Sequence, residues 1–171
     1  IEVRLLGDSF ATPLLRAACH AVGLPLDCVH ELPLAPGVDN HTWIDAAISL
    51  ASGPLSHLIA IERVGPSHTL DSLAAQSSTS PASSAELFTT EVPEVSRDVC
   101  HTMRGIPISQ LTAPAHRLFE QPQRTYKTIG MGDGGNEIGL GRIPWEVLHT
   151  TIARGPAGKI ACRIATDYLL L

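Results

Sequence analysis

The stretch YKTIGMGDGGNEIGLG, residues 126–141, joins a strand pattern to a glycine-rich loop. Its first residues are mostly apolar, as is typical of a buried strand, and six glycines lie within residues 130–141. Glycine lacks a Cβ atom, so such a loop can bend tightly and let another group approach its backbone. Asp133, Asn136 and Glu137 stand among these glycines. The stretch therefore predicts a functional site directly after a strand.

Strand and helix patterns alternate on both sides of this stretch. Short apolar runs indicate strands, and apolar residues at helical spacing indicate the helices between them. The expected strands lie near residues 1–6, 26–29, 57–62, 126–131 and 159–171, and the expected helices near residues 9–23, 43–50, 113–121 and 144–155. This alternation predicts an α/β fold, a single domain with a largely parallel sheet flanked by helices. In such folds, sites lie at the carboxyl ends of the strands.

Residues 66–96 differ in composition from the rest of the chain. They are rich in Ser, Thr, Ala and Pro and have no strong apolar period. Such a segment has little apolar surface with which to offset the entropy lost on ordering, so we expect a flexible surface insertion. The chain opens inside an apolar run and stops on three leucines. We therefore assign residues 1–171 to one domain, with this insertion, of a longer protein.

Composition excludes several classes of partner. The 171 residues carry a formal net charge of −5 and no basic patch, which argues against nucleic acid binding. No apolar run reaches the roughly 18 residues that suggest a membrane span. The 4 cysteines form no C-x-x-C pair, so neither a zinc site nor a disulfide framework is expected.

The glycine spacing Gly130-x-Gly132-x-x-Gly135 matches the dinucleotide-binding fingerprint. However, Asp133 places a carboxylate where that motif holds pyrophosphate, and two anions so close repel each other. The acid expected about 20 residues further on is also missing. The chain has no Gly-Lys-Ser/Thr sequence of a Walker loop. We therefore expect no nucleotide cofactor.

Asp133, Asn136 and Glu137 have a different use if the glycines bend the chain so that all three project together. Two carboxylates and an amide oxygen are hard ligands suited to Mg²⁺ or Mn²⁺. Carboxylates held close together also raise one another's pKa, which provides a general acid. The structural alternative is that Asp133 caps a following helix and the glycines serve only the turn.

The motifs GDGGNEIGLG (132–141), RIPWE (142–146) and KIACRIATDYLLL (159–171), with AIERVG (60–65) and MRG (103–105), closely resemble the C-terminal domain family of D-glutamate cyclase. The resemblance covers roughly the whole chain, and the glycine motif carries most of it. It implies a lyase that converts D-glutamate to 5-oxo-D-proline with loss of water. It also implies a location in the mitochondrial matrix for the vertebrate form.

Cyclisation requires the substrate amine to attack the side-chain carboxyl carbon, so the site must hold a carboxylate and move protons. The guanidinium groups of Arg104 and Arg63 suit a carboxylate, although either could instead form a structural ion pair. The expected catalytic residues are Asp133, Glu137 and Glu62, with Asp133 and Glu137 as hypothetical metal ligands. The expected substrate-binding residues are Arg104, Arg63, Asn136, Gly134 and Gly135.

Two other functions stay open at this stage. The same acids could serve a metal-assisted hydrolase of a small amide, or a binding module that only recognises an amino acid. In each case the expected partner is a small molecule, here D-glutamate, and an oligomer is possible.

Overall fold

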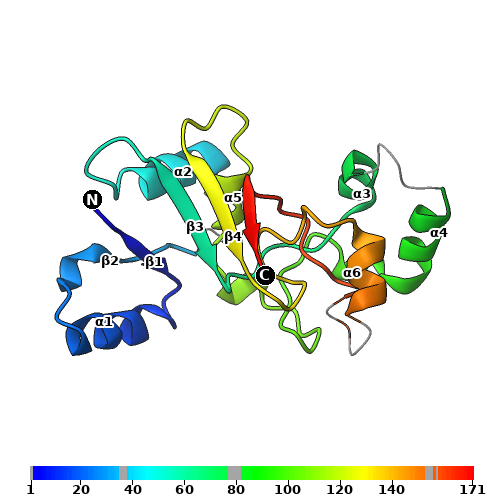
Figure 1. Cartoon of the computed structure of the whole chain (residues 1–171), viewed down its shortest axis with the longest axis horizontal. Coiled ribbons are helices and arrows are strands. Elements are labelled where there is room, and N and C mark those ends of the chain that lie inside the picture. Colours follow the sequence, from blue (N-terminus) through cyan, green and yellow to red (C-terminus); the bar gives the residue numbers. More distant parts are fainter. Residues whose placement is uncertain (1, 35–37, 77–81, 153–155, 157) are drawn as a thin grey trace.

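A computed structural model describes residues 2–34, 38–76, 82–152, 156 and 158–171 (Figure 1). Its strands are β1 (Leu5–Gly7), β2 (Val29–Glu31), β3 (His57–Ile61), β4 (Lys127–Met131) and β5 (Tyr168–Leu170). Its α-helices are α1 (Thr12–Ala21), α2 (Asn40–Ile48), α3 (Leu70–Gln76), α4 (Ala82–Glu91), α5 (His116–Phe119) and α6 (Trp145–Thr151). Short 3₁₀ helices span Leu26–Cys28, Glu94–Ser96 and Ser109–Leu111.

All strand pairs within the two sheets are parallel, which confirms the predicted α/β class. The central sheet has the order β3-β4-β5, and β1 pairs with β2 in a second, two-stranded sheet. Ile61 is paired with Met131, and Met131 with Leu170, so the three central strands end at the same edge. This register positions whatever follows β3 and β4 side by side.

One face of the central sheet is buried and the other is exposed. Ala60 in β3 belongs to a core cluster with Trp43 and Ile44 of α2 and Leu118 of α5. Ile59 and its alternate neighbours in β3 point the other way and are exposed. This alternation is the period-2 pattern of a strand with one covered face. In Figure 1, α2 and α5 lie behind the sheet, on its covered side.

A second core cluster forms between α3, α4 and α6, to the right of the central sheet in Figure 1. Its centre is Trp145 of α6, which meets Phe88 of α4 edge to face with 5.2 Å between ring centroids. Leu73 of α3 and Val92 are buried in the same cluster. The prediction of a surface insertion over residues 66–96 is therefore wrong for α3 and α4, whereas its residues 77–81 lie outside the described part of the chain. A few large apolar side chains, spaced among Ser and Thr, are enough to pack two helices.

Some element boundaries also differ from the prediction. Helix α1 begins at Thr12 instead of near Ser9, and its cap position Ala11 offers no side-chain hydrogen bond. The final strand is confined to Tyr168–Leu170, because the preceding residues form isolated bridges with the glycine loop and with Ser67. The expected helix stop at Gly155 lies outside the described residues. Within the described part of the chain, no helix combines the length and the apolar character of a membrane span.

Candidate active site

Three carboxylates converge at the shared edge of β3 and β4. Glu62 follows β3 directly, while Asp133 and Glu137 belong to the loop after β4. One carboxylate oxygen of each lies within 4.8 Å of the others. The structure thus brings together the three residues that the sequence suggests as catalytic. Glu62 is far from Asp133 and Glu137 in the sequence, and the parallel pairing of β3 with β4 brings them together.

The glycine loop folds back over the end of β3, and this return brings Glu137 to Glu62. Residue Glu137 forms an antiparallel bridge with Val64. The Ile138 amide donates to the Arg63 carbonyl at 2.8 Å, and the Gly65 amide donates to the Asn136 carbonyl at 3.0 Å. These backbone bonds fix the loop against residues 63–65.

Side chains fill the space beside two of the loop's glycines. A Cβ atom on Gly132 would lie 2.7 Å from the Cβ of Glu137, and one on Gly134 would lie 2.6 Å from the Glu137 Oε1 atom. Both distances are closer than side-chain atoms normally approach. The loop is not followed at once by a helix, since α6 begins only at Trp145. Asp133 therefore caps no helix, and the loop differs from the strand-loop-helix arrangement of a dinucleotide site.

Glu137 is buried, whereas Glu62 and Asp133 are exposed. Its Oε2 atom accepts a hydrogen bond of 3.1 Å from the Gly134 amide. Burial raises the pKa of the Glu137 carboxyl, and the neighbouring charge of Glu62 raises it further, although the amides of the loop act in the opposite direction. Glu62 has a positive φ of 50°, a conformation that costs energy in a residue with a side chain.

The raised pKa makes the stability of the metal-free protein depend on pH. Folded Glu137 holds its proton more strongly than the unfolded chain does, so ionising it disfavours folding. Protonated Glu137 therefore stabilises the folded state below the ordinary pKa of 4.5. This stabilisation is lost as the pH rises through the higher pKa that Glu137 has in the folded protein. We expect Glu137→Gln to raise the free energy of unfolding at pH 7 but not at pH 3. Urea denaturation at both pH values measures this difference, and an equal effect at both would contradict it.

The acidic cluster has a donor set that could hold a divalent cation. Mg²⁺ and Mn²⁺ prefer carboxylate oxygens, and two oxygens on opposite sides of Mg²⁺ are about 4 Å apart. The carboxylate oxygens of Glu62, Asp133 and Glu137 lie within 4.8 Å of one another, so a small movement of these side chains would bring them to the spacing of such a site. Binding would need Glu137 in its ionised form, so proton and cation compete for it.

This competition predicts metal binding that weakens at low pH. We expect Mn²⁺ titrated into the protein to broaden the NMR signals of Gly132 and Gly134, with an affinity that falls as pH drops from 7 to 5. Asp133→Asn should abolish the effect, while the exposed α4 residue Glu86, changed to Gln, should leave it unchanged. Equal broadening in the Asp133→Asn variant would show that the ion binds elsewhere.

Arg104 lies in a separate turn, residues 102–105, which packs on the glycine loop through Met103. This turn is closed by a hydrogen bond of 2.9 Å from the Gly105 amide to the Thr102 carbonyl. The Met103 sulfur packs on the glycine loop, 2.2 Å from where a Cβ of Gly134 would stand. Arg104 itself is exposed, and no carboxylate pairs with it in the described part of the chain. Its guanidinium is therefore available to a substrate.

Arg63 occupies a different position from the one expected of a substrate-binding residue. Its Nη1 and Nη2 atoms donate to Asp8 at 2.5 and 2.8 Å, and Nη2 also donates to the Ala113 carbonyl. Asp8 accepts a further bond from the Ala113 amide at 2.8 Å. This arrangement favours the structural ion pair, which ties the end of β1 to the end of β3.

The remaining predicted substrate-binding residues are engaged in hydrogen bonds within the protein. Asn136 is buried, and its Nδ2 atom donates to the His101 carbonyl at 2.7 Å. The Gly134 amide is used by Glu137, and the Gly135 carbonyl accepts from the Cys162 amide at 2.8 Å. Asn136 thus joins the glycine loop to the segment that carries Arg104. The spacing of residues in the sequence does not indicate the contact between Asn136 and His101 or the packing of Met103 on the glycine loop.

A comparison with protein-family models matches residues 69–171 to the family described as D-glutamate cyclase-like, C-terminal. The chain belongs to this family. The match covers more than half of the chain and includes the glycine loop, Arg104 and β4. A comparison with curated proteins found no match.

Within this D-glutamate cyclase-like domain, the candidate site extends beyond the matched residues. Asp133, Glu137 and Arg104 lie inside the match, whereas Glu62 and Arg63 precede it. Glu62 still completes the acidic cluster because β3 pairs with β4. The site of the domain is thus built from two parts of the chain.

Proposed function

We propose that this domain is a lyase that converts D-glutamate to 5-oxo-D-proline and water. The observation that carries the proposal is the convergence of Glu62, Asp133 and Glu137 at one strand edge. Membership of the D-glutamate cyclase-like family supports the choice of substrate.

The reaction defines what the site must do. A bond forms between the α-nitrogen of D-glutamate and its side-chain carboxyl carbon, and one carbon–oxygen bond of that carboxyl breaks. The ammonium group gives up two protons, and the departing oxygen takes up two to leave as water. Holding the substrate in a folded conformation brings nitrogen and carbon together, which for an intramolecular attack supplies much of the rate gain.

The three carboxylates divide the proton transfers according to their surroundings. Glu62 and Asp133 are exposed and take protons from the ammonium group. Glu137 is buried against the Gly134 amide and gives one proton to the departing oxygen, while Glu62 or Asp133 passes on the second. The other proton taken from the ammonium group restores Glu137. In its ionised form, Glu137 could hold a divalent cation together with Asp133, and that cation would supply charge stabilisation for the developing oxyanion.

Arg104 binds the α-carboxylate of the substrate in this proposal. The turn that carries it packs on the glycine loop through Met103, which supports placing Arg104 at the substrate. A planar guanidinium with two parallel donors suits a carboxylate. A location in the mitochondrial matrix is part of the proposal only through the family resemblance.

The reaction is tested by following D-glutamate with the purified protein in ¹H NMR, with and without added Mn²⁺. The expected result is the appearance of 5-oxo-D-proline at a rate proportional to protein concentration. Saturable binding of D-glutamate without product would contradict the lyase and support a binding module. Consumption of added 5-oxo-D-proline without measurable formation would support the ring-opening hydrolase instead.

Substitution of Arg104 tests its role in substrate binding. We expect Arg104→Gln to raise KM by roughly 10-fold to 100-fold with a smaller change in kcat, because a hydrogen-bonded ion pair contributes about 1.5–3 kcal/mol. Arg104→Lys should recover only part of the loss, since lysine lacks the paired donors. The exposed α1 residue Arg16, changed to Gln, is the matched control. An unchanged KM in Arg104→Gln would remove Arg104 from the site.

A further inference from the structure

A hollow lies apart from the acidic cluster, between the first turns of α2 and residues 117–122 in and after α5. Its volume is about 260 Å³, and its lining includes Asn40 and Ile44 from α2. Arg117, Glu120 and Pro122 line the opposite side. No member of the acidic cluster contributes to it. The hollow is smaller than a typical drug-sized pocket of roughly 300–1,000 Å³.

The positive side chain that lines this hollow is Arg117, which pairs with no carboxylate among the described residues. Its guanidinium carbon lies 6.0 Å from the ring centroid of Trp43. Its Nη1 atom is buried and has no hydrogen-bond partner among the described residues. No carboxylate in the described ranges pairs with it. Arg117 also lines the hollow, so a carboxylate bound there would find an unpaired guanidinium beside it.

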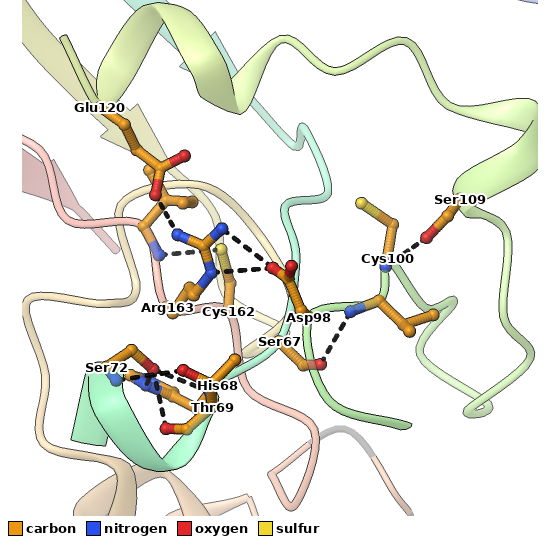
Figure 2. Close-up of polar contacts among 12 residues, drawn as sticks. Ser67, His68, Thr69, Ser72, Asp98, Cys100, Ser109, Glu120, Cys162 and Arg163 are labelled. Atoms are coloured by element: carbon orange, nitrogen blue, oxygen red, sulfur yellow. Dashed lines mark hydrogen bonds and ion pairs between the residues drawn. The ribbon is translucent and has the colours of Figure 1, made fainter. Parts of the chain in front are cut away.

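The negative side chain that lines this hollow is Glu120, and its charge is only partly neutralised by Arg163. Its Oε1 atom accepts from Arg163, and the same guanidinium donates to Asp98 at 2.9 and 3.1 Å. Figure 2 shows Arg163 between the two carboxylates, with the second oxygen of Glu120 directed away from it. Two carboxylates therefore share one guanidinium. Glu120 retains an acceptor for a cationic donor in the hollow.

We propose that this hollow binds the zwitterionic end of a free amino acid with a small apolar side chain. Arg117 takes the carboxylate and Glu120 takes the ammonium group. Ile44 and Pro122 provide an apolar surface for the side chain. The hollow is lined by one positive and one negative side chain, which together match a zwitterion better than either a simple anion or a simple cation. This site is independent of the proposed lyase reaction.

The test titrates D-alanine and L-alanine separately into ¹⁵N-labelled protein. We expect at least one enantiomer to shift the side-chain signals of Asn40, Gln121 and Arg117 in a saturable way. Propionate and ethylammonium, which are alanine without its amine and without its carboxylate, should each bind at least tenfold more weakly. Propionate binding as tightly as alanine would contradict the role of Glu120. No saturable shift with either enantiomer would overturn the site.

Variants separate this site from the acidic cluster. Asn40 is the first residue of α2, so Asn40→Asp adds a carboxylate where helix ends favour negative charge and should leave the fold intact. It also gives Arg117 an internal partner, and we expect alanine affinity to fall roughly tenfold, as it should in Arg117→Gln. Arg16→Gln and Asp133→Asn should leave the titration unchanged. Undiminished affinity in Asn40→Asp, or a loss in Asp133→Asn, would overturn the proposal.

Discussion

Glu137→Gln should lower the rate of 5-oxo-D-proline formation by a factor of roughly 10²–10⁴, the usual contribution of a positioned acid or base. Glutamine keeps the size of the side chain, and its carbonyl oxygen can still accept from the Gly134 amide. What it loses is the proton that the departing oxygen needs. The rate is measured by NMR under substrate saturation, so that a change in KM does not mask the effect.

The same variant separates a chemical role from a structural one. Because Glu137 is a buried carboxyl with a raised pKa, removing its charge should not reduce stability at pH 7. Inactivity with full or increased stability therefore identifies Glu137 as part of the chemistry. Glu86→Gln, at an exposed position of α4, should retain full activity. Activity of Glu137→Gln close to that of the unmodified protein would contradict the proposed proton transfer.

Arg63→Met should reduce the free energy of unfolding by about 3–5 kcal/mol, which is the usual cost of breaking a buried ion pair. Both partners are largely buried, with side-chain exposures of 19% for Arg63 and 15% for Asp8. Without the guanidinium, the Asp8 carboxylate keeps only the Ala113 amide as a partner among the residues that the structure describes. Urea denaturation at pH 7 measures the loss.

Two comparisons sharpen this result. Asp8→Asn combined with Arg63→Met should cost less than the sum of the single changes, because no unpaired charge remains. Lys159→Met breaks the more exposed pair with Glu91 and should cost much less than Arg63→Met, because solvent screens this pair. Loss of turnover in Arg63→Met without a loss of stability would instead place Arg63 in substrate binding.

The central sheet and the convergence of the acids could be predicted because they follow from local patterns. The apolar runs of β3 and β4 are visible in the sequence, and parallel strands end at one edge. Glu62 and Asp133 each follow such a run closely. Their proximity therefore required no knowledge of long-range packing beyond the pairing of two strands.

Other features depend on contacts that sequence patterns do not encode. The Arg63–Asp8 pair and the Asn136–His101 bond join residues far apart in the chain, and isolated charges or amides carry no spacing signal. The Ser/Thr-rich segment packs because Phe88 meets Trp145, a partner supplied by a later helix. In each case the sequence shows one half of a contact, and the fold supplies the other.

The central claim is that Glu62 and Asp133, from two segments of the chain, act in one site. The most direct test is a double-mutant cycle on turnover, with Glu62→Gln, Asp133→Asn and the two combined. If both serve one proton-transfer unit, the double variant should be little slower than the slower single variant. Rate losses that multiply, or a fully active Glu62→Gln variant, would contradict a shared site.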